Sequence, residues 1–392
     1  MESRIKLNSI IKRTVILIIP LSVLLFSYTA SKLHYYDLPA SSSYMMLFLL
    51  FYATYISHKY WRLMHYREIK FVILFFILSL PAYFVSSFTS VESVLRLFAL
   101  IAFVPLGFFS GLAWGHQYNQ VAIEKRDRII TLLLIPAIIV MMIIISTSFI
   151  FPFFSESERD YVFGMVILLP LLAYYRKKLL PTLFLCIATY ICIISSKRTG
   201  LLCIASIVPF IFVSYEKGFN KKAKKVLSIL LVVVVFGLIA YSLLPSISPE
   251  IDSSIERFEN MDDQSSEHRL SMYMMTIDEI SNSDILSLFF GHGCLGTISL
   301  YGIPTHNDWL EIIYDYGVIP FICFLFFYFS LVIRVFKSFR NNLYSSLPLL
   351  STLIIFTITT MVNCMFTTPV SVFILLFTLG FSLVHLKAYN TR

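Results

Sequence analysis

Residues 94–115 read VLRLFALIAFVPLGFFSGLAWG, an apolar run in which Arg96 is the single charged side chain. A helix of this length rises roughly 33 Å, which is enough to cross a bilayer hydrocarbon core of about 30 Å. The run is continuous, whereas a membrane-spanning β-strand would alternate apolar and polar residues. Backbone polar groups in lipid must be satisfied within their own segment, so the run predicts a transmembrane helix.

Similar runs recur along the whole chain. Of its 392 residues, 58% are hydrophobic and 14% are charged, whereas a soluble globular domain has about a quarter charged residues. We therefore predict an all-α polytopic membrane protein with about 12 transmembrane helices and one large external loop containing short helices. The predicted helices cover 14–30, 44–57, 71–88, 94–115, 129–150, 161–175, 179–195, 201–215, 226–244, 310–333, 343–363 and 367–386.

The positive charges support this count. If the N-terminus is cytoplasmic, the segments on the inner side hold about 24 of the 31 Lys and Arg residues, as the positive-inside rule requires. Merging or splitting one helix would scramble this alternation, so we predict that both termini lie in the cytoplasm. The net charge of +8 is then explained by topology, and it indicates no nucleic-acid partner.

The predicted order has three parts: transmembrane helices 1–9 in residues 1–244, the large external loop in residues 245–309, and helices 10–12 with a cytoplasmic tail in residues 310–392. Within the loop, residues 266–281 show a helical pattern with Leu270, Met274 and Ile277 on one face. The Gly291-His292-Gly293 run lacks the third glycine of a nucleotide-binding loop, and it predicts a turn.

Two arginines are candidate ligands for an anion on the outer side. Arg198 follows Lys197 in a tight turn between two helices, on the side where cations are disfavoured. A guanidinium there can bind phosphate through two hydrogen bonds; a cation whose charged end extends to the interface is the alternative. Arg269 begins the loop helix, where a solvated side chain or a weak surface ion pair with Glu267 is the alternative.

His306 is a candidate general base, because histidine titrates near neutrality. Its neighbours Asp308 and Glu311 are candidates for orienting the ring and stabilising its charged form. A polar surface histidine is the alternative. A metal site would have to use His292, His306 and Asp308, which lack the spacing of a metal-binding pair, so we predict no metal.

The order of these segments resembles the O-antigen polymerase and ligase family of bacterial surface-polysaccharide assembly. The residues that carry the resemblance fall between about 185 and 330. They are Ser195-Ser196-Lys197-Arg198-Thr199-Gly200, His268-Arg269-Leu270-Ser271-Met272-Tyr273, Gly291-His292-Gly293, Thr305-His306-Asn307-Asp308-Trp309-Leu310-Glu311, and Tyr316-Gly317-Val318-Ile319-Pro320. Pro320 departs from the family, in which glycine is more usual.

The resemblance implies a metal-independent glycosyltransferase of the bacterial inner membrane that needs no cofactor. Its donor would be an undecaprenyl-diphosphate-linked oligosaccharide, used on the periplasmic face, and a chain-length regulator is a candidate partner. By the same resemblance, Arg198 and Arg269 would hold the diphosphate and His306 would be the base. Lys197, Tyr273, Asn307, Asp308 and Glu311 would contact the substrate.

Three functions remain open at this point. The run Asn307–Glu311 and the following Asp-Tyr-Gly favour a polymerase, whose acceptor is a lipid-linked repeat unit. A ligase would instead transfer the glycan to lipid A–core. A lipid-linked oligosaccharide flippase is the alternative from another class, but it needs charges within its helices, and Arg96 is the single candidate.

Overall fold

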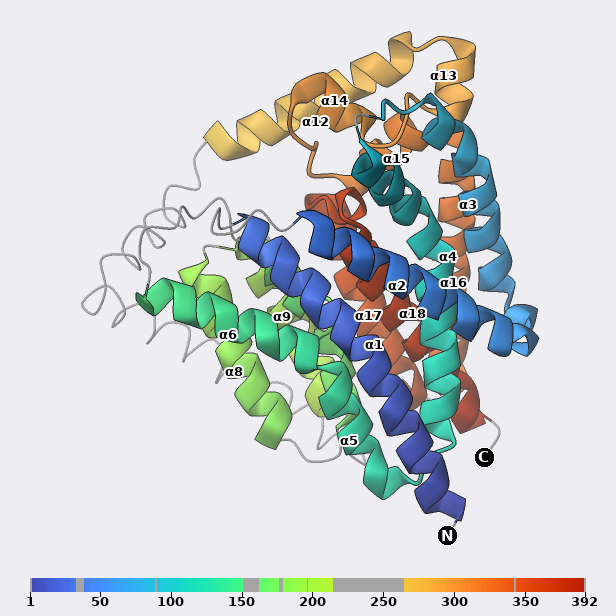
Figure 1. Cartoon of the computed structure of the whole chain (residues 1–392), viewed down its shortest axis with the longest axis vertical. Coiled ribbons are helices and arrows are strands. Elements are labelled where there is room, and N and C mark those ends of the chain that lie inside the picture. Colours follow the sequence, from blue (N-terminus) through green and yellow to red (C-terminus); the bar gives the residue numbers. More distant parts are fainter. Residues whose placement is uncertain are drawn as a thin grey trace.

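The computed structural model describes residues 2–32, 39–88, 90–150, 162–175, 179–195, 197–213, 264–341 and 343–390. All the regular secondary structure in these ranges is helical (Figure 1). The segments are α1 (Glu2–Lys32), α2 (Pro39–Lys59), η1 (Trp61–His65), α3 (Arg67–Val85), α4 (Val91–Asn119), α5 (Ile123–Leu133), α6 (Ile135–Ile150), α7 (Val162–Val166), η3 (Leu169–Tyr174), α8 (Leu179–Ile194), α9 (Arg198–Val213), α12 (Gln264–Asn282), α13 (Ile285–Phe290), α14 (Gly296–Tyr301), α15 (Asp308–Tyr316), α16 (Val318–Asn341), α17 (Leu343–Val362), η4 (Met365–Thr367) and α18 (Pro369–Asn390).

Four described helices are long and apolar enough to cross a membrane. The four candidate spans are Asn8–Leu25, Arg67–Val85, Val91–Asn119 and Val318–Phe339. Five further apolar helical segments are shorter. The predicted all-α membrane class is therefore supported. The count of twelve stays a prediction, because the run 226–244 lies outside the described residues.

Three predicted helices are each divided in the structure. The run 161–175 becomes the short helix α7 and the 3-10 helix η3. The run 129–150 breaks after Leu134 into α5 and α6, where Pro136 lacks the N–H that would continue the hydrogen-bond ladder. The run 310–333 breaks at Gly317, which has a φ of +92° and ends α15 before α16 begins. The break at Gly317 separates the short helix α15 from α16, which is long and apolar enough to span a membrane.

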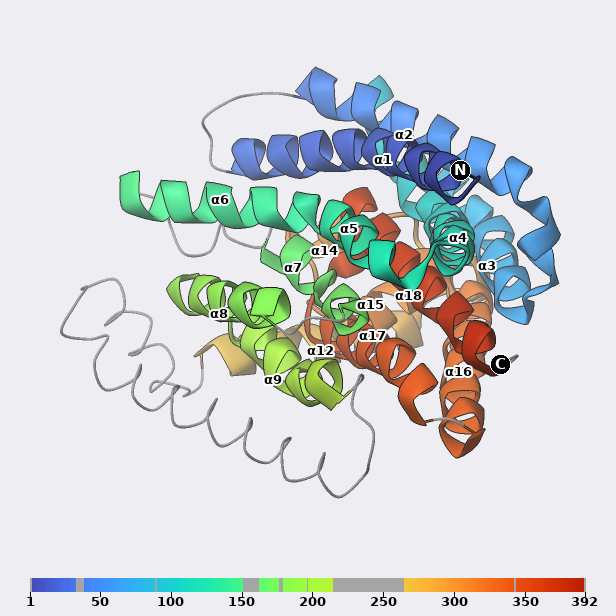
Figure 2. The ribbon, with the colours of Figure 1, turned by 90° about the horizontal axis from the view of Figure 1, so that it is seen from below.

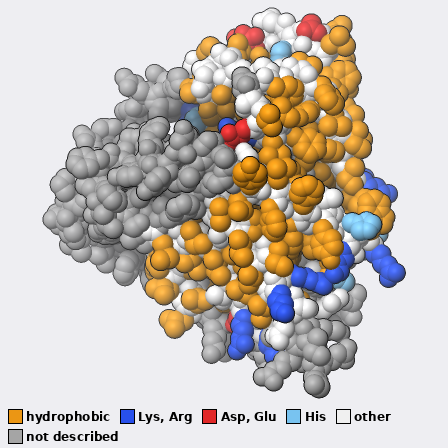
Figure 3. Space-filling view, in the orientation of Figure 1, with side chains coloured by type: hydrophobic (Ala, Val, Ile, Leu, Met, Phe, Trp, Pro, Cys, Tyr) orange, Lys and Arg blue, Asp and Glu red, His pale blue; other side chains and the backbone are white. Residues whose placement is uncertain are grey.

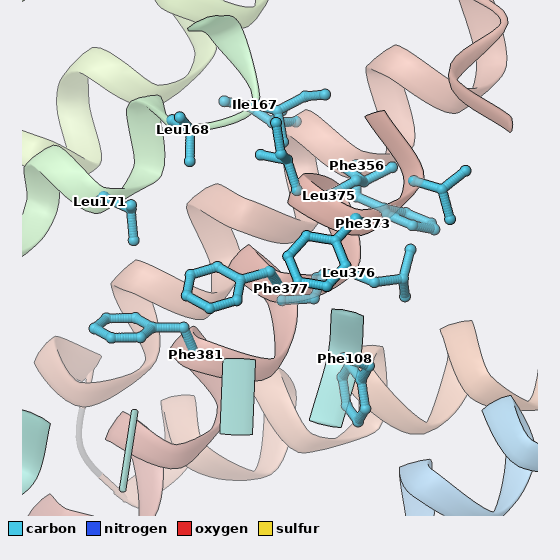
Figure 4. Packing of buried hydrophobic residues seen from close by; sticks show 14 of the residues in the cluster. Phe108, Ile167, Leu168, Leu171, Phe356, Phe373, Leu375, Leu376, Phe377 and Phe381 are labelled. Atoms are coloured by element: carbon cyan, nitrogen blue, oxygen red, sulfur yellow. The ribbon is translucent and has the colours of Figure 1, made fainter. Parts of the chain in front are cut away.

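The centre of the molecule is built on close packing between α4 and α18. Gly107, Gly111 and Gly115 form a stripe along α4 at four-residue spacing. A Cβ atom on Gly111 would lie 2.0 Å from the backbone oxygen of Phe377, so the two helix backbones approach more closely than a side chain permits. Figure 4 shows Phe373, Phe377 and Phe381 along α18, with Phe108 of α4 beside them.

The other helices surround this pair. Seen from below, α1, α2 and α3 lie on one side of α4 and α18, whereas α8 and α9 lie on the other (Figure 2). Both termini are at the lower end in Figure 1, and α12, α13, α14 and α15 are at the upper end. On the face drawn in Figure 3, Lys and Arg side chains gather below a broad band of hydrophobic ones.

Polar contacts join the segments that were predicted to share the inner side. Buried Glu68 at the start of α3 forms an ion pair with Arg334 of α16, in which Arg334 Nη2 lies 2.9 Å from Glu68 Oε2. Arg13 of α1 donates to Gln117 of α4 over 3.4 Å. Arg13 also donates to the Tyr60 hydroxyl over 3.0 Å. Together these contacts bring the described parts of the segments 1–13, 58–70, 116–128 and 334–342 to one end of the molecule.

Candidate active site

His306 lies in the turn between α14 and α15, in an unusual backbone conformation. Its φ is +59°, in the left-handed region that few non-glycine residues adopt. The next residue, Asn307, is the N-cap of α15: its Oδ1 accepts from the backbone N–H groups of Trp309, at 3.0 Å, and Leu310, at 3.3 Å. Asn307 thus fixes the point at which the chain leaves His306 and becomes helical.

The Glu311 carboxylate stabilises this turn through hydrogen bonds. It is 2% exposed, and its Oε1 accepts from the Thr305 backbone N–H at 2.7 Å and from the Thr305 hydroxyl at 3.0 Å. The backbone of His306 hydrogen-bonds the same carboxylate. Burial raises the pKa of Glu311 to about 7, although these hydrogen bonds act in the opposite direction. The described hydrogen bonds of Glu311 therefore hold the backbone beside the imidazole.

Asp308 fastens the first turn of α15 to another part of the chain. It is fully buried, and its two oxygens accept from the backbone N–H groups of Met365, at 3.0 Å, and Phe366, at 2.8 Å. Burial, and then the nearby Glu311 charge, raise the pKa of Asp308 well above its usual range. These bonds join the His306 turn to η4, which connects α17 and α18. This arrangement favours a positioning role for Asp308.

Helix α12 brings Arg269 toward His306. The Tyr273 hydroxyl of α12 donates to the backbone oxygen of His306 over 3.3 Å. Arg269 is partly buried one turn earlier on the same helix. Burial raises the pKa of Tyr273, and the positive charge of Arg269 acts in the opposite direction. Tyr273, which is 33 positions from His306 in the chain, thus connects the helix that contains Arg269 to the His306 turn.

A small cavity of about 50 Å³ lies beside the His306 ring. Its wall includes Asn363 and Cys364 after α17, and Phe163 and Gly164 of α7. His306 Nδ1 lies 3.8 Å from Cys364 Sγ. Asn363 Nδ2 is buried and has no hydrogen-bond partner among the described residues. An unpaired buried donor of this kind can bind an oxygen atom of a ligand that enters the cavity.

The helix that Arg198 begins packs against α7, which lines this cavity. Arg198 is the first residue of α9, after Lys197, whose backbone N–H bonds the Cys192 oxygen at 2.9 Å. The first turn of α9 contains Gly200, and a Cβ atom on this residue would lie 3.6 Å from Val166 of α7. Helix α7 also contributes part of the cavity wall. The first turn of α9 therefore packs on an element that lines the His306 cavity.

The Gly291-His292-Gly293 segment forms the predicted turn and lies against α15. The backbone N–H of His292 donates to the oxygen of Tyr314 at 3.0 Å, and that of Gly293 donates to the oxygen of Asp315 at 3.1 Å. The rings of His292 and Tyr314 stack with centroids 4.1 Å apart. This turn therefore supports the helix that follows His306.

Asn363 and Cys364 were not among the predicted site residues. They lie at the junction of the last two predicted runs, 343–363 and 367–386, where Asn363, Thr367 and Thr368 interrupt the apolar sequence. That position in an outer turn was the available signal, but the pairing of this turn with His306 depends on the tertiary contact made by Asp308.

Comparison with known families supports the resemblance. The model of a family described as O-Antigen ligase matches residues 182–325. The matched stretch contains Arg198, Arg269 and His306, and it confirms the predicted relation to the O-antigen polymerase and ligase family over these residues. Comparison with curated proteins finds no match.

Proposed function

Because residues 182–325 match an enzyme family that joins glycan chains to acceptors, we propose that this protein is a glycosyltransferase at the outer face of a bacterial inner membrane. Its donor is a glycan on a polyprenyl diphosphate carrier. The observation that carries the proposal is the hydrogen bond from Tyr273 to His306, which joins the helix of Arg269 to the turn of His306 beside a cavity.

The chemistry needs one base and stabilised phosphate charge. A hydroxyl oxygen of the acceptor sugar attacks the anomeric carbon, and the bond from that carbon to the diphosphate oxygen breaks. The His306 imidazole takes the hydroxyl proton during the attack. The leaving diphosphate gains negative charge, which Arg269 and Arg198 stabilise because their guanidinium groups hydrogen-bond phosphate oxygens in pairs. Protein groups fulfil every role in this step, so it requires no metal or cofactor.

The other predicted residues divide into two groups. Tyr273, Asp308, Asn307 and Glu311 make hydrogen bonds within the protein, and we assign them to positioning His306 and α15. Lys197 is next to Arg198 in sequence and adds positive charge for the diphosphate. A further binding group is Asn363, whose unpaired Nδ2 in the cavity wall can donate to a substrate oxygen.

We favour a polymerase over a ligase. The run from Asn307 to Glu311 followed by Asp315-Tyr316-Gly317 is similar to polymerases, so the acceptor is a lipid-linked repeat unit, and a chain-length regulator is a candidate partner. The membrane orientation that fits has both termini in the cytoplasm, because the cationic end in Figure 3 lies near them. The family match lends no support to a flippase.

The surface polysaccharide of a deletion strain tests this assignment. Core carrying a single repeat unit on a gel is the result expected for a polymerase. Core without any repeat unit would instead identify a ligase. Carrier-linked units accumulating on the inner face of the membrane would identify a flippase and would overturn the glycosyltransferase proposal.

A further inference from the structure

Helix α13 is a short apolar helix with no buried residue. It spans Ile285–Phe290 in the sequence ILSLFF. Ile285 is 72% exposed and Leu286 is 70% exposed, and both phenylalanines are also exposed. A helix with so much apolar surface in water is unusual for a folded protein, and it indicates a contact with lipid or protein.

The exposed surface of α13 is continuous with that of two membrane-spanning helices. Helix α13 packs against the outer ends of α3 and α16. Phe84 at the end of α3 is 73% exposed, and Phe326 on α16 is also exposed. Since both helices are long and apolar enough to span a bilayer, their exposed side chains face lipid. In Figure 3, hydrophobic side chains continue up the right-hand edge of the molecule, where Figure 1 draws α3 and α13, to the upper end.

The backbone of α13 is suited to an apolar environment. Asp284 caps its first turn, because Oδ1 accepts from the backbone N–H groups of Leu286, at 2.9 Å, and Ser287, at 3.1 Å. The Ser287 hydroxyl donates to the other oxygen of Asp284 at 2.6 Å. At the opposite end, the Gly291 N–H bonds the oxygen of Ser287 at 2.8 Å. These bonds satisfy groups that would be costly to leave unpaired near lipid.

Close backbone contacts keep α13 at this level. A Cβ atom on Gly317 would lie 2.3 Å from the oxygen of Phe289, so the last turn of α13 touches the junction of α15 and α16 directly. Soon after α13, the backbone N–H of Cys294 donates to the Ser86 hydroxyl at the end of α3 over 2.8 Å. The helix therefore cannot move away from the outer ends of α3 and α16 without breaking these contacts.

We propose that α13 is an interfacial anchor whose exposed apolar side chains insert into the outer leaflet of the bilayer. Helices of this kind lie about 5–10 Å into the boundary between headgroups and acyl chains. Helix α13, which lies between α12 and the turn of His306 in the chain, then attaches the external loop to the membrane in addition to the membrane-spanning helices. The inference depends on exposure and packing, and it is independent of the proposed glycosyltransferase activity.

Photocrosslinking in native membranes tests this anchor. The photoreactive residue p-benzoylphenylalanine replaces Leu286 in one variant, Phe84 in a second and Ser281 in a third. Phe84 is the lipid-facing control on α3, and Ser281 is the control on the exposed polar end of α12. All three side chains are exposed, so the replacements leave the core unchanged. After irradiation, the adducts are identified by intact-protein mass.

We expect a phospholipid adduct at position 286 in the same yield as at position 84, and none at position 281. Two results would overturn the proposal. A variant at position 286 that forms no lipid adduct, like the one at 281, would place α13 in water. A crosslink from position 286 to protein would mean that a second copy or another protein covers α13.

Discussion

The replacement Glu311→Gln tests whether Glu311 positions His306 or binds the substrate. The carboxylate accepts hydrogen bonds from Thr305 and from the backbone of His306. A glutamine of the same shape offers one oxygen and one NH₂ group. The NH₂ group then faces a backbone N–H that has lost its acceptor. As a result, the left-handed conformation of His306, with a φ of +59°, is less stabilised.

The size of the effect follows from the hydrogen bonds that are lost. One hydrogen bond to a charged group contributes about 1.5–3 kcal/mol. A left-handed backbone conformation at a non-glycine residue costs a similar amount, about 1–3 kcal/mol. Losing the first therefore allows His306 to relax out of the left-handed region. We expect kcat to fall by about 10- to 150-fold, which corresponds to that range of free energy.

The assay measures chain transfer by purified protein in lipid nanodiscs, with a polyprenyl-diphosphate-linked oligosaccharide as donor. If Glu311 positions His306, kcat falls while the KM for the donor stays unchanged. Asp278→Asn is the matched control, because it replaces an exposed acid on α12, and it should leave both constants unchanged. A raised KM with normal kcat would mean that Glu311 binds substrate. Unchanged kcat and KM would refute both roles.

Three further predictions concern the same site. Arg269→Lys should lower chain transfer by about 10- to 100-fold, because an ammonium group cannot bind phosphate in a bidentate way; near-normal transfer would identify a solvated surface arginine. Asp308→Asn should lower the free energy of unfolding by about 1–3 kcal/mol, because one buried backbone N–H at Met365 or Phe366 loses its acceptor; an unchanged melting temperature in detergent would contradict this. Burial raises the pKa of Glu311 from 4.5 to about 7 in the folded protein, so folding favours the protonated carboxyl group. The contribution of this group to the free energy of unfolding is complete below pH 4.5 and is lost as the pH rises through 7. At about 1.36 kcal/mol per pH unit the loss is about 3 kcal/mol, and Glu311→Gln should remove it from the pH dependence of thermal unfolding; an equal pH dependence in both proteins would contradict it.

Most of the helical pattern could be predicted from the sequence, because continuous apolar runs specify membrane helices directly. The division at Gly317 was harder to predict, since the apolar pattern continues through it. Likewise, the pattern of residues 266–281 predicted α12 and placed Leu270, Met274 and Ile277 on one face. That face is exposed, and the helix instead buries Met272 and Thr276.

The site could be predicted in part. Residue types and their order singled out His306 and Arg269 as candidates, and the structure places Tyr273, one turn after Arg269, in hydrogen-bond contact with the backbone oxygen of His306. The hydrogen bonds of Asp308 and Glu311 could not be predicted. Neighbouring positions in sequence suggest contact with the imidazole, whereas the fold directs both carboxylates to backbone N–H groups and Glu311 also to the Thr305 hydroxyl. Asn363 was missed because it joins the site through a contact between residues far apart in the chain.

The transfer rate of His306 variants tests the central claim most directly. His306→Ala removes the imidazole, and so does His306→Asn, which tolerates the left-handed backbone better. His65→Ala is the control, because that histidine is exposed in η1 at the opposite end of the molecule. With normal protein levels in the membrane, we predict that chain transfer by both His306 variants falls by about 10²- to 10⁴-fold, while the control is normal. Full-length polymer made at the normal rate by His306→Asn would contradict the account.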